Sequence, residues 1–344
     1  MLDNSRYLGL DLARFFAALV VALGHLFFTQ SLITDWSLSQ RGLSPFRFGS
    51  LSVAFFFTLS GFVLAPQMEL IRHKPLRWIQ ARLIRLLPLY YFSWLIPLFF
   101  FIALAQRNGG PLFPNGLQSA VWGLFASQSW TGYYLDLPNP PLWSLSVEVW
   151  LSLLLVLLAF AIKNLLVRVF LTLVCFIFAS IYIEYLGPVL GSVHYFLLGI
   201  LISEDRVLSF TKQRIAQFIL FLSLFPTFYP IYTEVLLNHQ SKLNLPCKSI
   251  FCCISILLLS NAKIPDSIKA ISNYLGQRSY SLYATHFPIL VFITQIFPFF
   301  GFLSPWVYTL IIVSILLIST EFAYKYIDRP SLEISRRWRK YARR

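Results

Sequence analysis

The sequence predicts an all-α integral membrane protein, a bundle of about ten transmembrane helices with both termini in the cytoplasm. Hydrophobic residues make up 57% of the 344 residues and charged residues only 12%, and the mean hydropathy is +0.68. Apolar runs recur that approach the ~20 residues a helix needs to cross a bilayer. Lys and Arg gather in alternate loops, as the positive-inside rule requires. This composition excludes a soluble globular enzyme.

Each predicted span is an apolar run bounded by charges or by Pro and Gly clusters. In chain order the runs are residues 8–29, 49–66, 86–105, 142–162, 165–187, 188–203, 215–237, 245–260, 279–299 and 303–324. Those at 188–203 and 245–260 are short enough to be re-entrant or tilted. The first run carries charges and has no small-residue cleavage site after it, so we expect a retained helix. We expect one transmembrane domain over residues 1–344, with a short basic cytoplasmic tail at about 325–344.

The formal net charge of +14 is explained by topology. With the N terminus inside, 22 of the 28 Lys and Arg residues fall in inner loops and the tail, and five fall in outer loops. Orientation in the bilayer therefore accounts for the basic excess, and no nucleic-acid partner is expected. The four cysteines lack the paired spacing of a zinc site and the density of a disulfide scaffold, so no metal is expected either.

The first apolar run carries three ionisable residues, Asp11, Arg14 and His25, which are costly inside a membrane and by default mark function. Eleven steps of 100° return to within ~20° of the starting direction, so Arg14 and His25 share one helix face, about 16 Å apart along the axis. Asp11 joins them as the i,i+3 neighbour of Arg14. Two interpretations of these residues stay open. In the first, Asp11 and Arg14 form an ion pair that anchors the helix near the inner interface, and His25 caps a polar cavity. In the second, His25 accepts a proton.

Five short motifs follow one another along the chain. They are Leu10–Arg14 with His25 eleven residues after Arg14, Phe56–Phe62 (FFTLSGF), Arg82–Arg85 (RLIR), Trp143–Glu148 (WSLSVE) and Ser279–His286 (SYSLYATH). In this order they resemble the motifs of the membrane-bound acyltransferase 3 family, which is widespread among bacterial O-acetyltransferases of cell-surface sugars. The resemblance covers nearly the whole chain. The chain resembles the stand-alone members of the family, which carry no extracytoplasmic hydrolase-like domain.

The resemblance implies a multi-pass protein of the bacterial inner (cytoplasmic) membrane with a ten-helix core. It also implies transfer of an acyl group from cytoplasmic acyl-CoA to an acceptor that is usually on the outer side. We therefore expect an O-acetyltransferase that uses acetyl-CoA, or another acyl-CoA, to modify a surface polysaccharide, an O-antigen or a lipid-linked glycan. A small hydrophobic metabolite such as a macrolide is the alternative acceptor.

Acyl transfer to a hydroxyl needs a base for the alcohol proton and stabilisation of an oxyanion. His25 is assigned as the base, since a neutral imidazole can take that proton and later return it to the departing thiolate. Arg14, with Asp11 as its partner, either polarises the thioester carbonyl or binds the pantetheine arm. Glu148 lies in an apolar run, where it either orients His25 or Arg14 or pairs with another buried base.

Donor binding is expected from Arg82, Arg85, Ser60 and Arg14. Arg82 and Arg85 are i,i+3 neighbours that present two guanidinium groups where CoA phosphates would arrive, although the positive-inside rule alone also accounts for them. Ser60 or His25 can also carry a covalent acyl group; direct transfer is preferred because no serine lies in a recognisable nucleophile elbow. Gly61 permits close helix packing, which is an equal interpretation of the Ser60-Gly61 pair.

Acceptor binding is expected from Trp143, Tyr283 and His286. His286 either lines the cavity or hydrogen-bonds across helices. Aromatic residues near the outer side either stack on sugar rings or form an interfacial belt; they are Trp130, Tyr133, Tyr134 and Trp143.

A rival function is a proton-coupled transporter or flippase. Asp11, Arg14, His25 and Glu148 equally suit a proton relay inside a helix bundle. No inverted repeat in the sequence supports that function. Consumption of acyl-CoA separates the two, because a transporter has no need to cleave the thioester.

Overall fold

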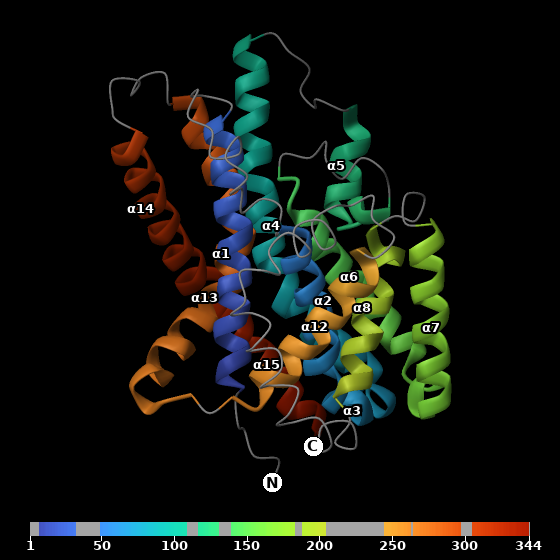
Figure 1. Cartoon of the computed structure of the whole chain (residues 1–344). Helices are drawn as coiled ribbons and strands as arrows, with labels where there is room; N and C mark the ends of the chain where they lie inside the picture. The colour runs from blue at the N-terminus through green and yellow to red at the C-terminus, as the bar shows by residue number, and fades with distance from the viewer. Residues whose placement is uncertain are drawn as a thin grey trace.

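The computed structural model describes residues 7–31, 49–108, 116–130, 139–182, 188–203, 244–262, 264–296 and 305–343 (Figure 1). Every regular element in these ranges is a helix. The α-helices are α1 (Leu8–Ser31), α2 (Gly49–Leu64), α3 (Met68–His73), α4 (Pro75–Asn108), α5 (Gly116–Leu124), α6 (Leu142–Leu158), α7 (Leu165–Tyr182), α8 (Pro188–Ile202), α12 (Asn244–Ser260), α13 (Asp266–Ile296), α14 (Pro305–Ala323) and α15 (Arg329–Arg343). Short 3-10 turns are η3 (Ala65–Gln67), η4 (Gln128–Trp130) and η6 (Ala161–Lys163), and η9 (Tyr324–Asp328) is a π-helical turn.

Nine of the ten predicted apolar runs fall on these helices, and the run at 215–237 lies outside the described residues. Two helices begin well before the run they contain, α4 at Pro75 and α13 at Asp266. Charged residues end an apolar run without ending a helix, because Lys and Arg have good helix propensity. Arg82 and Arg85 lie inside α4, so they are neighbours on one helix as their i,i+3 spacing predicted.

Several helices have the length and composition that a membrane requires. Three segments are long and apolar enough to cross a bilayer, Leu8–Leu26, Gly49–His73 and Thr309–Lys340, and four shorter apolar helices accompany them. The helix α7 exposes a stripe of large apolar side chains at helical spacing; they are Leu166, Phe170, Leu173 and Ile177, each more than half exposed. A continuous exposed apolar face of this kind suits contact with lipid. The fold therefore agrees with a membrane protein.

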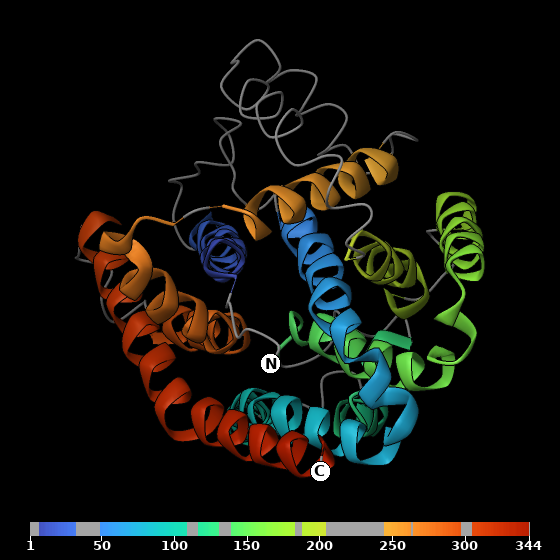
Figure 2. The same cartoon turned by 90° about the horizontal axis from the view of Figure 1, so that it is seen from below.

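Helices far apart in the sequence pack against one another. The helix α1 packs against α13, α2 against α8, and α4 against both α6 and α15. Figure 2, viewed from below, shows the segment from α14 to α15 running along the outside of the bundle until α15 lies beside α4. The first residues of α1 lie at the same end of the bundle as α15 (Figure 1). The side of a membrane that this end faces stays a prediction of the charge pattern.

The predicted basic tail is helical and belongs to the bundle. The helix α14, the π turn η9 and α15 follow one another without a break from Pro305 to Arg343. A π turn is uncommon, and it often occurs at functional sites. The helix α15 contacts α4 along its length, so the end of the chain helps to build the space between α4 and its neighbours.

The helices α2 and α8 approach each other closely at two glycines. A Cβ atom added at Gly61 would lie 2.0 Å from the carbonyl oxygen of Phe196, and one added at Gly199 would lie 1.9 Å from that of Thr58. Each glycine therefore lets the backbone of the other helix come into direct contact. The packing interpretation of Gly61 is confirmed, and this contact fixes the position of Ser60 beside it.

Candidate functional site

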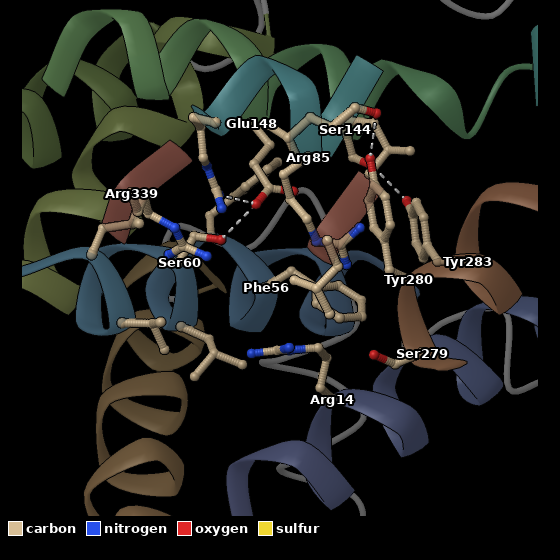
Figure 3. Close-up of a pocket in the computed structure, with 18 residues that line it drawn as sticks. Arg14, Phe56, Ser60, Arg85, Ser144, Glu148, Ser279, Tyr280, Tyr283 and Arg339 are labelled. Atoms are coloured by element: carbon tan, nitrogen blue, oxygen red, sulfur yellow. Dashed lines mark hydrogen bonds and ion pairs between the residues drawn. The ribbon is translucent and has the colours of Figure 1, made fainter. Parts of the chain in front are cut away.

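A cavity of about 200 Å³ lies between α1, α2, α4, α6, α13 and α15 (Figure 3). Six of the residues predicted as site residues line it: Arg14, Ser60, Arg82, Arg85, Glu148 and Tyr283. Arg339 of α15 also lines it, and the sequence analysis did not single out that residue. Four arginines and one glutamate thus surround a small space, which gives the lining a positive formal charge. Such a lining suits an anionic ligand.

Glu148 holds together the side of this cavity that α2, α4 and α6 form. Its carboxylate pairs with the guanidinium of Arg82, and its Oε1 accepts a hydrogen bond of 3.2 Å from the hydroxyl of Ser60. Arg82 also donates through Nε to the hydroxyl of Ser152, at 3.2 Å. The sequence left His25, Arg14 or another buried base open as the partner of Glu148. In the structure its partner is another base, Arg82. Ser60, on α2, is oriented by the same carboxylate.

Arg85 has a different carboxylate partner, Asp328, which the sequence analysis missed. The two side chains form an ion pair, and Asp328 is only 1% exposed. The hydroxyl of Ser281 donates to the second carboxylate oxygen at 3.3 Å, and the guanidinium lies 4.8 Å from the ring centre of Tyr280. Asp328 is the last residue of η9, so the π turn brings this carboxylate to α4. An acidic residue four positions after the end of the last apolar run was the available signal.

Arg14 approaches the cavity from α1. Its Nη1 lies 3.9 Å from the Oδ1 of Asp11, so the ion pair that the i,i+3 spacing predicts is present. The Arg14 side chain lines the cavity and stays one third exposed, whereas the side chain of Asp11 is 10% exposed. Figure 3 shows Arg14, Arg85 and Arg339 placed around the same space. The first helix therefore contributes a cation to the cavity.

His25 and His286 form a second polar centre. The Nε2 of His286 lies 3.2 Å from the Nδ1 of His25, and the ring centres are 5.1 Å apart. His286 is fully buried on α13, and His25 is partly buried on α1. Neither ring is among the residues that line the cavity. Two roles were left open for His286, lining the cavity or a hydrogen bond across helices. The structure shows the contact across helices, with His25.

The backbone fixes which nitrogen of each ring carries the proton when both are neutral. The Nδ1 of His25 lies 3.0 Å from the carbonyl oxygen of Val21, and the Nδ1 of His286 lies 2.6 Å from that of Tyr283. Because a carbonyl oxygen only accepts, both Nδ1 atoms must be protonated to make these bonds. The single Nδ1–H of His25 is then shared between the carbonyl oxygen of Val21 and the Nε2 of His286. The lone pair of His25 is left on its Nε2, which is the atom that can take a proton.

Tyr283 connects the cavity with the histidine pair. Its hydroxyl accepts a hydrogen bond of 2.7 Å from Ser144, and its backbone carbonyl accepts from His286 three residues further along α13. Tyr283 and Ser144 both line the cavity. The late motif therefore places one residue in the cavity and another beside His25.

The predicted aromatic contacts are part of the helix packing. Trp143 packs edge-on against Phe57, with ring centres 6.2 Å apart, and Trp130 packs edge-on against Trp150 at 5.5 Å. Tyr133 and Tyr134 lie outside the described residues. Within the part of the chain that the structure describes, no group of three or more His, Cys, Asp or Glu residues is placed to hold a metal ion. Cys175, Cys247, Cys252 and Cys253 are free thiols.

A family model described as an acyltransferase domain, that of the acyltransferase 3 family, matches residues 7–324. The match begins with the residue before α1 and ends at the first residue of η9, so it contains both histidines and all the cavity arginines except Arg339. Comparisons with curated proteins and with solved structures found no match.

Proposed function

The chain belongs to the acyltransferase 3 family, and on this basis we propose that it is a membrane O-acyltransferase with acetyl-CoA, or another acyl-CoA, as donor. The proposed acceptor is a hydroxyl group of a surface polysaccharide, an O-antigen or a lipid-linked glycan. The proposed location is the inner membrane of a bacterium, with both termini in the cytoplasm. One transmembrane domain, with α15 as its C-terminal part, would carry the reaction.

One observation carries the proposal: a single face of α1 bears both a cation in a basic cavity and a histidine whose proton-accepting nitrogen is defined. Arg14 lines the cavity, and His25 is held by Val21 and His286. An anionic donor suits the first centre, and removal of a hydroxyl proton suits the second. Acyl transfer from a CoA thioester to an alcohol requires both.

The chemical step follows from the proton positions in the histidine pair. The Nε2 of His25 takes the proton of the acceptor hydroxyl as its oxygen attacks the thioester carbonyl carbon. A C–O bond forms and the C–S bond breaks, and the imidazolium returns the proton to the departing thiolate. The Nδ1–H of His25 stays bonded to Val21 and His286 throughout. These bonds keep the imidazole in one orientation and one tautomer.

The spacing along α1 favours one of the two roles predicted for Arg14. Eleven residues of α-helix place Arg14 about 16 Å from His25 along the axis. Side chains on a helix lean toward its N terminus, so both groups lean the same way and stay about as far apart as their backbone positions, which favours action at two separate points of the donor. Arg14 is therefore assigned to the donor at a point away from its thioester, such as the pantetheine arm.

The cavity suits one part of the donor rather than all of it. Its volume of about 200 Å³ is below the ~300–1,000 Å³ typical of pockets that enclose a whole drug-sized ligand. Arg82 and Arg85 line it while they are held by Glu148 and Asp328, so their guanidinium groups are oriented before the ligand arrives. Acceptor contacts by Trp143, Tyr283 and His286 stay part of the proposal.

The test is transfer of label from labelled acetyl-CoA into the glycan fraction of membranes that contain the protein. Membranes with His25→Ala at matched expression should show no label above background. A matched control is His73→Ala, which removes an exposed histidine on α3. Full labelling with His25→Ala would overturn the base assignment. Intact acetyl-CoA in wild-type membranes would favour the proton-coupled transporter or flippase, and label in small lipophilic products would favour a macrolide-type acceptor.

A further inference from the structure

Prolines interrupt the backbone hydrogen bonds of two helices in the bundle. Pro97 lies inside α4, and Pro288 lies inside α13. A proline has no N–H group, so the carbonyl four residues before it loses its helical hydrogen bond. The carbonyl groups freed in this way are those of Ser93 and Ala284. A buried carbonyl of this kind needs another donor, since a bundle in a membrane has little water to offer.

One side chain supplies both missing donors. The amide nitrogen of Asn139, Nδ2, donates to the carbonyl of Ser93 at 2.9 Å and to that of Ala284 at 3.2 Å. A side-chain amide nitrogen carries two hydrogens, so each carbonyl receives one of them. The residue is buried, with 1% exposure. Asn139 therefore joins α4 to α13 at the two points where a proline leaves a carbonyl without its N–H.

The start of α6 holds Asn139 in this place. The backbone carbonyl of Asn139 accepts from the N–H of Leu142, the first residue of α6, at 3.1 Å. Two further bonds join the same turn to α13. The hydroxyl of Tyr283 donates to the carbonyl of Pro141 at 3.4 Å, and Ser144 donates to that hydroxyl at 2.7 Å. Three contacts from one short segment thus converge on one stretch of α13.

That stretch of α13 carries His286. The residue lies two positions after Ala284 and two before Pro288, so it belongs to the turn that the proline interrupts. Its Nε2 lies 3.2 Å from the Nδ1 of His25. A proline lets a helix bend at this turn, and the remaining contacts decide how far. The bond from Asn139 to Ala284 therefore influences where the imidazole of His286 lies.

We propose that Asn139 is a positioning residue of the acyl transfer. It bonds the two carbonyl groups that Pro97 and Pro288 leave free, and in this way it fixes the path of α13 at the interrupted turn. That path keeps His286 within hydrogen-bond distance of His25. The inference rests on the proposed function and adds to it a residue that is not among those that line the cavity.

The first experiment is a double-mutant cycle on kcat. The rate of label transfer from saturating acetyl-CoA to the glycan fraction, divided by the amount of folded protein, gives kcat. Asn139→Ala should lower kcat about tenfold, the loss expected for His286→Ala, and leave the donor KM unchanged. In a chain that already carries His286→Ala, the same change should lower kcat by less than about twofold, because the group that Asn139 positions is absent.

Two variants serve as comparisons. Asn139→Asp keeps the shape of the side chain but places an oxygen against two carbonyl oxygens, so it should not restore the kcat of Asn139→Ala. The matched control is Asn261→Ala. The Nδ2 of Asn261 also donates twice, to the carbonyl of Leu257 at 2.7 Å and to the hydroxyl of Ser260 at 3.2 Å, but both partners lie on α12 and Asn261 is exposed. This control should keep the kcat of the wild type.

Thermal unfolding in detergent tests the two hydrogen bonds without acyl transfer. Asn139→Ala should lower the unfolding temperature by several degrees, because two buried carbonyl groups lose their donor. A second chain carries Pro97→Ala and Pro288→Ala, which give both carbonyl groups a helical N–H again. In that chain Asn139→Ala should lower the unfolding temperature far less. Folding of Asn139→Ala in the second chain alone would support the inference in the same way.

Three outcomes would overturn the inference. A wild-type kcat in Asn139→Ala would remove the residue from the reaction. Losses in kcat that multiply when Asn139→Ala and His286→Ala are combined would show that Asn139 does not act through His286. An equal fall of the unfolding temperature in both chains, or failure to fold in both, would show that Asn139 does not replace the N–H groups that the prolines lack. Failure of the proposed function is distinct, because the wild type would then transfer no acyl group while the unfolding comparison still gives its answer.

Discussion

Replacement of Gly199 by alanine should destabilise the bundle at the contact between α2 and α8. The added Cβ would lie 1.9 Å from the carbonyl oxygen of Thr58, which is about 1.5 Å short of the 3.4 Å at which ordinary van der Waals contact begins. That oxygen belongs to a helix backbone, so the two helices must separate to make room. Overpacking of this kind costs about 1–3 kcal/mol.

The same helix provides the control. An added Cβ at Gly191 meets nothing within 4 Å, so Gly191→Ala gains helix propensity without a clash. That change should be neutral or stabilise α8 by roughly 0.5–1 kcal/mol. The two variants therefore differ in steric contact and share the same chemical change.

Thermal unfolding in detergent measures the difference. At about 2–4 °C per kcal/mol for a chain of a few hundred residues, Gly199→Ala should unfold several degrees below the wild type. Acyl transfer should fall as well, because separation of α2 from α8 moves Ser60 relative to Glu148. Equal unfolding temperatures for Gly199→Ala and Gly191→Ala would refute the reasoning that this close approach stabilises the fold.

Three further changes test the site. Arg85→Ala leaves the buried carboxylate of Asp328 without its cation and should lower the free energy of unfolding by about 3–5 kcal/mol. The unfolding temperature measures this loss, and adding Asp328→Asn to the same chain should restore part of it. Ser60→Ala removes one hydrogen bond to Glu148, worth about 1 kcal/mol, and should keep acyl transfer within roughly tenfold of wild type; complete loss with a folded protein would instead support a covalent carrier. His286→Ala should lower kcat about tenfold and leave the donor KM unchanged. His286→Gln, whose amide oxygen can accept a hydrogen bond from His25, should restore part of the lost kcat. A kcat equal to that of the wild type in both variants would remove His286 from the mechanism.

Local spacing predicted the parts of the site that lie on one helix. The ion pair of Asp11 with Arg14 follows from the i,i+3 rule, and its distance of 3.9 Å agrees with that prediction. The shared face of Arg14 and His25 follows from helix geometry in the same way. Which residue of another helix faces each of them does not follow from spacing, because tertiary packing decides it. His286 as the neighbour of His25 is a case of this kind.

The carboxylates show where sequence reasoning reached its limit. Arg82 and Arg85 have equivalent places in one motif, yet one pairs with Glu148 of α6 and the other with Asp328 of η9. The residues of each pair are 66 and 243 positions apart. Arg339 was counted with the basic tail because the positive-inside rule explains any cation there. The spacing of four residues between Ser331, Ser335 and Arg339, which places them along one face of α15, was the available signal that the tail packs against another helix.

The π turn makes the number of residues between α14 and α15 a determinant of the site in its own right. Insertion of one further helical residue within Tyr324–Asp328 would rotate every later residue by about 100° around the axis relative to α14. The hydroxyl of Ser335, which donates to the backbone carbonyl of Ala81 at 2.6 Å, would lose this bond. Arg339 would turn away from the cavity although the composition of the helix stayed almost the same. This segment should therefore tolerate substitution of its exposed positions, such as Lys325 and Tyr326, far better than insertion.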